Sequence, residues 1–114
     1  MTKKTDMTQT GDILARITDI IEARKSADPM ASYVAQLFTA GTQKMAQKVG
    51  EEGVEVAIAA TAGDTSGLAS ESADLLFHLM VLLAHKGLSL NDIANILAER
   101  EGLSGIAEKA GRPQ

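Results

Sequence analysis

The sequence lacks cysteine and tryptophan, and it has only one tyrosine, two phenylalanines and two prolines among 114 residues. The absence of cysteine excludes disulfides, zinc–thiolate sites and thiol nucleophiles, and it fits a reducing compartment. The net charge is −4, so there is no basic surface for a phosphate backbone, and the few aromatic rings offer little on which a series of bases can stack. A nucleic-acid polymer is therefore not an expected partner.

Long hydrophobic runs are also missing. The longest apolar stretch, Leu75 to Ala84, contains His78 and is too short to cross a bilayer. The N-terminal segment MTKKTDMTQTGD has two lysines but no apolar core of the kind found in secretory signals. We therefore expect a soluble, cytoplasmic protein with no membrane partner.

The remaining composition predicts one helical domain. Hydrophobic residues make up 45% of the chain, and apolar positions recur with helical rather than strand periodicity. The length suits one core, so we expect an all-α bundle of about four to five helices. Residues 1–11 are expected to be a flexible N-terminus, 12–101 the domain, and 102–114 a loosely held tail.

Turn residues and apolar spacing place the helix ends. Thr42 is the expected N-cap of the third helix, and Ser89 with Asp92 resembles a capping box for the last one. Gly41 and Gly87 are expected stops for the preceding helices. The expected segments are helices at Asp12–Lys25, around Tyr33–Phe38, at Thr42–Thr61 and at Leu68–Lys86, a polar loop at Gly63–Gly67, and a last helix through Leu97.

Two pairs of acidic residues stand out on neighbouring helices. Glu52 and Glu55 form one pair and Glu71 and Asp74 the other, each at i, i+3 and hence on one helix face. At 100° per residue, Glu52 falls in the middle of the apolar stripe that starts at Met45. An unpaired charge in an apolar interior is costly, so these acids predict a divalent cation site.

The chemistry of the donors favours magnesium at this site. All four are carboxylates, and hard oxygen ligands select Mg²⁺, with Mn²⁺ as a substitute, over zinc. Mg²⁺ usually completes its coordination with water and substrate phosphates. Lys44 and Lys48 lie on the flank of the same stripe, so the sequence predicts a phosphorylated substrate.

Ordinary structural roles remain open for several of these residues. A single acid pair at this spacing is usually a solvated helix face, and Lys48 can simply pair with Glu52 at i, i+4. His78 shares the acidic band and is a candidate site residue, but a helix histidine is more often a hydrogen-bonded packing residue. His85 stands near a helix C-terminus, where its charge suits the dipole. The segment Leu75 to Ala84 is apolar on nearly all sides, which predicts coverage by a partner subunit.

Two long segments, GTQKMAQKVGEEGVEVAIAA and ESADLLFHLMVLLAHKGLSLNDIANILAER, closely resemble the phosphoribosyl-ATP pyrophosphatase family of histidine biosynthesis. That family belongs to the all-α, MazG-like nucleotide pyrophosphohydrolases, whose mark is ExxE followed by ExxD. The runs KVGEE, DLLFHL and SGIAEKAGR extend the resemblance over residues 28–112.

The resemblance implies Mg²⁺-dependent cleavage between the α and β phosphates of phosphoribosyl-ATP, which yields phosphoribosyl-AMP and pyrophosphate, by an intertwined homodimer. A pyrophosphohydrolase of (d)NTPs from the same superfamily and a non-catalytic helical dimerisation module are the alternatives. The residue roles it implies are metal ligation by Glu52, Glu55, Glu71 and Asp74, an outer-shell or base role for Glu51, and phosphate binding by Lys44 and Lys48.

Overall fold

The computed structural model describes residues 8–101, which form five α-helices. No strand occurs within this range, so the all-α prediction is confirmed. The expected C-terminal tail, 102–114, and the first seven residues lie outside the described part of the chain. The helices are α1 (Thr8–Arg24), α2 (Tyr33–Ala40), α3 (Thr42–Thr61), α4 (Thr65–His85) and α5 (Leu90–Glu99).

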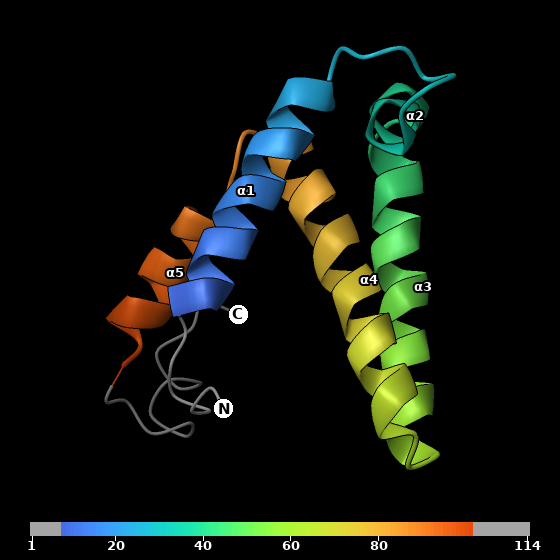
Figure 1. The fold of residues 1–114 in the computed structure, drawn as a ribbon, viewed down its shortest axis with the longest axis vertical. Helices are drawn as coiled ribbons and strands as arrows, with labels where there is room; N and C mark the ends of the chain where they lie inside the picture. The colour runs from blue at the N-terminus through green and yellow to red at the C-terminus, as the bar shows by residue number, and fades with distance from the viewer. Residues whose placement is uncertain (1–7, 102–114) are drawn as a thin grey trace, which may run out of the picture.

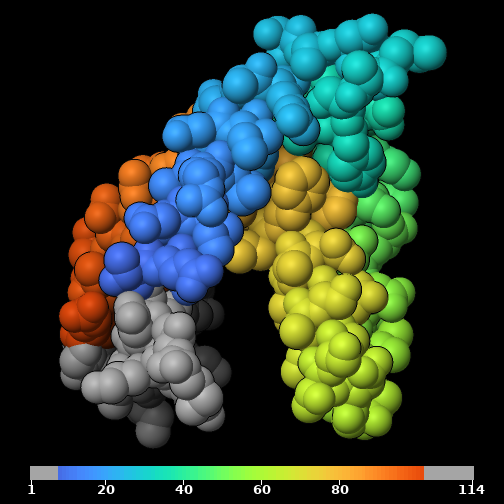
Figure 2. Space-filling view, in the orientation of Figure 1, coloured from blue at the N-terminus to red at the C-terminus, as the bar shows by residue number. Residues whose placement is uncertain are grey.

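The helices form two arms that meet at one end of the molecule (Figure 1). Helices α3 and α4 lie side by side as an antiparallel hairpin, whereas α1 and α5 form the other arm and α2 crosses the top of α3. Figure 2 shows the arms diverging below their junction. The core lies at the junction and consists of Ile21, Val34, Leu37, Met45, Met80, Val81 and Ala84.

Local capping explains where the helices begin. Helix α4 starts at Thr65 rather than the expected Leu68, because the Asp64 side chain accepts a 2.8 Å hydrogen bond from the Gly67 amide. Most of the expected loop at Gly63–Gly67 is therefore the cap and first turn of α4. The capping box of Ser89 and Asp92 is confirmed at the start of α5.

Two other helix starts differ from the expectation. Helix α1 begins at Thr8, four residues before the expected Asp12. Thr42 is the first helical residue of α3 and not its N-cap; Gly41 takes that position with φ 94°, a conformation that favours glycine. The Thr42 hydroxyl instead lies 3.0 Å from His85 Nε2 of α4, so it ties the two helices of the hairpin together.

Much apolar surface of the described chain remains exposed. The Cα radius of gyration is 16.2 Å, whereas a compact domain of this length has about 13 Å.

Helix α4 is long and apolar enough to cross a membrane by length and composition, and 22% of its most apolar 18-residue segment is buried. This helix is longer than the apolar stretch Leu75–Ala84 that was considered in the sequence. The core helix of a soluble protein can be equally long and apolar, and α4 supplies Met80, Val81 and Ala84 to the core.

Candidate metal and phosphate site

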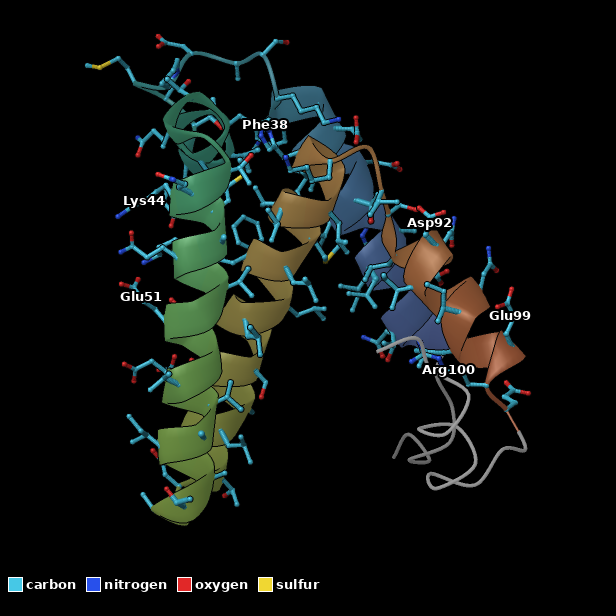
Figure 3. The ribbon with its side chains drawn as sticks, turned by 180° about the vertical axis from the view of Figure 1, so that it is seen from behind. Phe38, Lys44, Glu51, Asp92, Glu99 and Arg100 are labelled. Carbon is cyan, nitrogen blue, oxygen red and sulfur yellow. The ribbon has the colours of Figure 1, made fainter. Side chains whose placement is uncertain are left out.

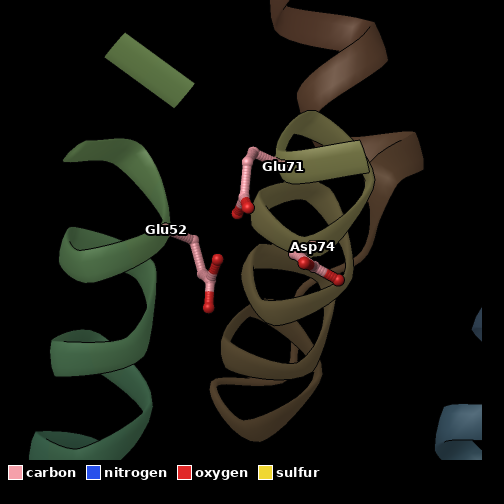
Figure 4. Close-up of side chains that lie close together, drawn as sticks. All are labelled: Glu52, Glu71 and Asp74. Atoms are coloured by element: carbon pink, nitrogen blue, oxygen red, sulfur yellow. The ribbon is translucent and has the colours of Figure 1, made fainter. Parts of the chain in front are cut away.

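Three of the predicted acids converge between α3 and α4. Glu52 of α3 and Glu71 and Asp74 of α4 each offer a carboxylate oxygen, and these oxygens lie within 4.8 Å of one another. Figure 4 shows Glu52 and Glu71 pointing toward each other across the hairpin, with Asp74 on the next turn of α4. Glu52 and Glu71 are partly buried, and Asp74 is exposed. We call these three residues the acidic cluster.

The sequence places the cluster through helix periodicity and one cap. Glu52 shares its face of α3 with Met45 and Ala59, both buried, so its side chain is turned toward α4. The Asp64 cap fixes where α4 begins, and Glu71 and Asp74 then follow within the first turns opposite Glu52. The i, i+3 spacing alone predicted the shared face, and the hairpin brings the two faces together.

The electrostatics of the cluster are unfavourable without a cation. Loss of water around Glu71 and the nearby negative charges of Glu52, Glu55 and Asp74 raise the pKa of Glu71 above its usual value of 4.5. The ion pairs found among residues 8–101 are Lys25–Glu22 and Lys48–Glu51, and neither neutralises the cluster. A divalent cation would therefore relieve a repulsion that the fold itself maintains.

Glu55 belongs to the surroundings of the cluster but not to the group of three. It is exposed, and it is not among the residues whose oxygens approach within the 4.8 Å limit. One turn beyond Glu52 on α3, its charge still contributes to the raised pKa of Glu71. The four predicted acids are thus neighbours, three of them at ligand distance.

Glu51 and Lys44 point away from α4 on the outer side of α3 (Figure 3). The Glu51 carboxylate accepts a 2.9 Å hydrogen bond from Gln47 Nε2 and lies 3.5 Å from Lys48 Nζ. The Gln47 hydrogen bond and the lysine charges lower the pKa of Glu51 below its usual value. Within one chain, Glu51 and the two predicted phosphate-binding lysines therefore lie beside the cluster and not in it.

His78 adjoins the cluster as a buried, hydrogen-bonded residue and is 7% exposed. Its Nδ1 lies 2.8 Å from the Asp74 carbonyl oxygen, and its Nε2 lies 2.9 Å from the Tyr33 hydroxyl. Local patterns do not predict the Tyr33–His78 contact, because it joins residues 45 positions apart. His85 similarly bonds to Thr42 and packs against Phe38.

Comparisons with known proteins find similar sequences that cover most of this chain. The family model for phosphoribosyl-ATP pyrophosphohydrolase matches residues 14–101. A phosphoribosyl-ATP pyrophosphatase from Rhizorhabdus wittichii is 56% identical over 101 residues, which cover 89% of this chain and 95% of that protein. One from Azospirillum brasilense is 57% identical over 88% of this chain and 90% of its own length. The histidine biosynthesis bifunctional protein HisIE of Vibrio parahaemolyticus is 58% identical over 76% of this chain and 41% of its own length.

Proposed function

The chain belongs to the phosphoribosyl-ATP pyrophosphohydrolase family, and from that membership we propose that it cleaves the α–β phosphoanhydride of phosphoribosyl-ATP. It is a hydrolase of phosphorus-containing anhydrides, and its products are phosphoribosyl-AMP and pyrophosphate in the second step of histidine biosynthesis. The acidic cluster is the observation in the structure that best supports this assignment, since it brings three carboxylates from two helices to within ligand distance of one another.

The donors of the cluster fit Mg²⁺, with Mn²⁺ as a substitute. Each of Glu52, Glu71 and Asp74 contributes a carboxylate oxygen, and no nitrogen or sulfur donor belongs to the group. When bound, the cation supplies neutralisation of phosphate charge and stabilisation of the charge that develops on the transferred phosphorus. Glu55 adds negative charge from the next turn and can complete the site through a water molecule.

The residues of the chain then bind and orient the substrate and deprotonate the attacking water. A water molecule attacks phosphorus, its oxygen forms the new P–O bond, and the bridging oxygen leaves with the other product. A carboxylate of the cluster accepts the proton of that water. We assign contacts with phosphate oxygens to Lys44 and Lys48 of α3, which lie outside the cluster within one chain. The Gln47 and Lys48 bonds to Glu51 leave that residue an outer position.

We also propose a homodimer. Val54 and Ile58 of α3 are 58% and 56% exposed, and Ile96 and Leu97 of α5 are 42% and 59% exposed. Such apolar surface, together with the open shape of the chain, is typical of a subunit that is completed by a second copy. Sedimentation equilibrium at micromolar concentration should give twice the mass of the chain, and a monomer would overturn the proposal.

The family acts on soluble metabolites, so we place the enzyme in the cytoplasm as a soluble protein. The substrate assignment is tested by incubation with Mg²⁺ and either phosphoribosyl-ATP or a panel of deoxynucleoside triphosphates, with release of pyrophosphate as the measurement. Turnover of phosphoribosyl-ATP supports the proposal. Turnover of deoxynucleotides alone would instead show a (d)NTP pyrophosphohydrolase, and no turnover of either would favour a non-catalytic module.

A further inference from the structure

The ring of Tyr33 is the most open aromatic surface in the described chain. It stacks on Phe77 with ring centroids 6.4 Å apart and planes 18° from parallel, yet Tyr33 is 46% exposed. The remaining ring, Phe38, is partly buried, lies beneath Lys25 Nζ at 5.7 Å and meets the edge of His85 at 5.4 Å. Tyr33 is therefore the ring with a face available to a planar ligand.

Hydrogen bonds hold this exposed ring in one orientation. The Asp74 carbonyl can only accept, so His78 Nδ1 is protonated and donates to it at 2.8 Å. His78 Nε2 is then the acceptor, and the Tyr33 hydroxyl donates to it at 2.9 Å. Phe77 backs the ring and packs edge-on against His78 at 5.5 Å. A side chain that is already ordered loses little conformational entropy when a ligand stacks on it.

The Tyr33 ring lies near the acidic cluster, because its hydrogen-bond partner His78 is close to Asp74 on α4. His78 follows Asp74 by one helical turn, which is about 6 Å along the axis of α4. Tyr33 thus lies beside the cluster on the side toward α2. The Tyr33 hydroxyl is connected through one histidine to the turn of α4 that carries Asp74. A nucleotide with its anhydride at the cluster can place its base against Tyr33.

We propose that the Tyr33 ring, backed by Phe77 and anchored by His78, is the platform on which the purine base of the substrate stacks. This inference rests on the proposed function, which places the anhydride at the acidic cluster. Stacking uses the π-face that every base has, so the platform distinguishes nucleotides from base-free phosphates. Tyr33 is a binding residue in this account, and His78 positions it.

The wild-type protein offers a direct test, because Tyr33 is its only tyrosine and there is no tryptophan. With tyrosine labelled by ¹³C, adenosine 5′-monophosphate and Mg²⁺ should move the Tyr33 ring-proton signals upfield through the ring current of the base. Ribose 5-phosphate with Mg²⁺ should leave them in place. Equal responses to both ligands, or none, would overturn the proposal. So would shifts that follow protein concentration rather than nucleotide, because a second copy would then cover the ring.

Variants test the same platform during turnover. Tyr33→Ala should raise KM for phosphoribosyl-ATP about tenfold with kcat nearly unchanged. Tyr33→Phe keeps the ring and should restore most of the binding. Thr42→Val removes the other hydroxyl–imidazole contact of α4, at His85, and should leave KM unchanged. An unchanged KM in Tyr33→Ala, or equal impairment in Tyr33→Phe, would contradict stacking.

These experiments distinguish a failure of the stacking proposal from a failure of the proposed enzyme function. Turnover of phosphoribosyl-ATP with no nucleotide-dependent shift at Tyr33 leaves the function and overturns the platform. An adenine-dependent shift without any turnover leaves the platform and overturns the substrate assignment.

Discussion

The carboxylates of Glu52 and Glu71 face each other across the α3–α4 hairpin, and Asp74 lies within ligand distance of both. Their mutual repulsion is maintained by the packing of the two helices, which the Thr42–His85 hydrogen bond also ties together. Loss of water around Glu71 and the charges of its acidic neighbours together raise the pKa of Glu71. A divalent cation bound there together with a polyphosphate would relieve the repulsion.

Glu71→Gln should stabilise the metal-free fold and abolish catalysis. The substitution keeps the shape of the side chain and removes one of three repelling charges. Thermal unfolding in EDTA should show a higher Tm than the wild type, while kcat/KM for phosphoribosyl-ATP falls by about 100-fold or more. Glu99→Gln on α5 is the matched control, with neither change expected (Figure 3). A lower Tm for Glu71→Gln in EDTA would show that the carboxylate has a stabilising contact instead.

The same repulsion predicts a pH dependence of stability. The folded-state pKa of Glu71 is raised above 4.5, so the folded protein binds the proton more tightly than the unfolded chain does. The metal-free wild type should therefore lose stability, relative to Glu71→Gln, as pH rises from about 4.5 through the raised pKa. Urea titrations of both proteins in EDTA across this range measure the difference. A gap that widens toward low pH has the wrong sign and would contradict the account.

Magnesium should stabilise the wild type through binding to the folded state. At a free Mg²⁺ concentration of about 100 times Kd, the gain is about 2.7 kcal/mol. Glu52→Gln and Glu71→Gln should lose most of the Mg²⁺-dependent shift in Tm, whereas Glu99→Gln should keep it. Equal shifts in all four proteins would place the bound ions outside the cluster.

Gly67→Ala should destabilise the protein by weakening the cap of α4. A Cβ at this position would meet the Asp64 carboxylate, with Cγ only 2.7 Å away, and would displace the group that accepts the Gly67 amide. Loss of such a cap costs about 1 kcal/mol. Gly50→Ala is the matched control, because its Cβ would meet nothing within 4 Å and alanine favours the interior of α3. Urea denaturation should show a lower free energy of unfolding for Gly67→Ala and a higher one for Gly50→Ala. A higher value for both variants would show that the Asp64 cap does not stabilise α4.

Local patterns in the sequence predicted most of the fold and the centre of the site. Apolar periodicity located five helices, and the i, i+3 spacing placed the acids of each pair on one face of their own helix. The hairpin brings Glu52 of one face to Glu71 and Asp74 of the other. The sequence pattern predicts that α4 begins at Leu68, whereas it begins at Thr65. The polar residues after Gly63 resemble a loop unless Asp64 is considered as a helix cap.

Contacts between distant residues were not predictable from such patterns. Tyr33 and His78 are 45 positions apart and Thr42 and His85 are 43 apart, and each contact depends on how α2 and α3 pack on α4. Glu55 differs in this respect, because helical projection at 100° per residue places Glu52 in the middle of the Met45 stripe and Glu55 on its flank. The structure accordingly leaves Glu55 outside the group of three.

Pyrophosphate release from phosphoribosyl-ATP, measured for the wild type, Glu71→Gln and Glu99→Gln with and without Mg²⁺, tests the central claim most directly. We expect turnover in the wild type and Glu99→Gln with Mg²⁺ only, and a loss of about 100-fold or more in Glu71→Gln. Wild-type turnover that persists in EDTA, or a Glu71→Gln enzyme as active as Glu99→Gln, would contradict a metal-binding catalytic site between α3 and α4.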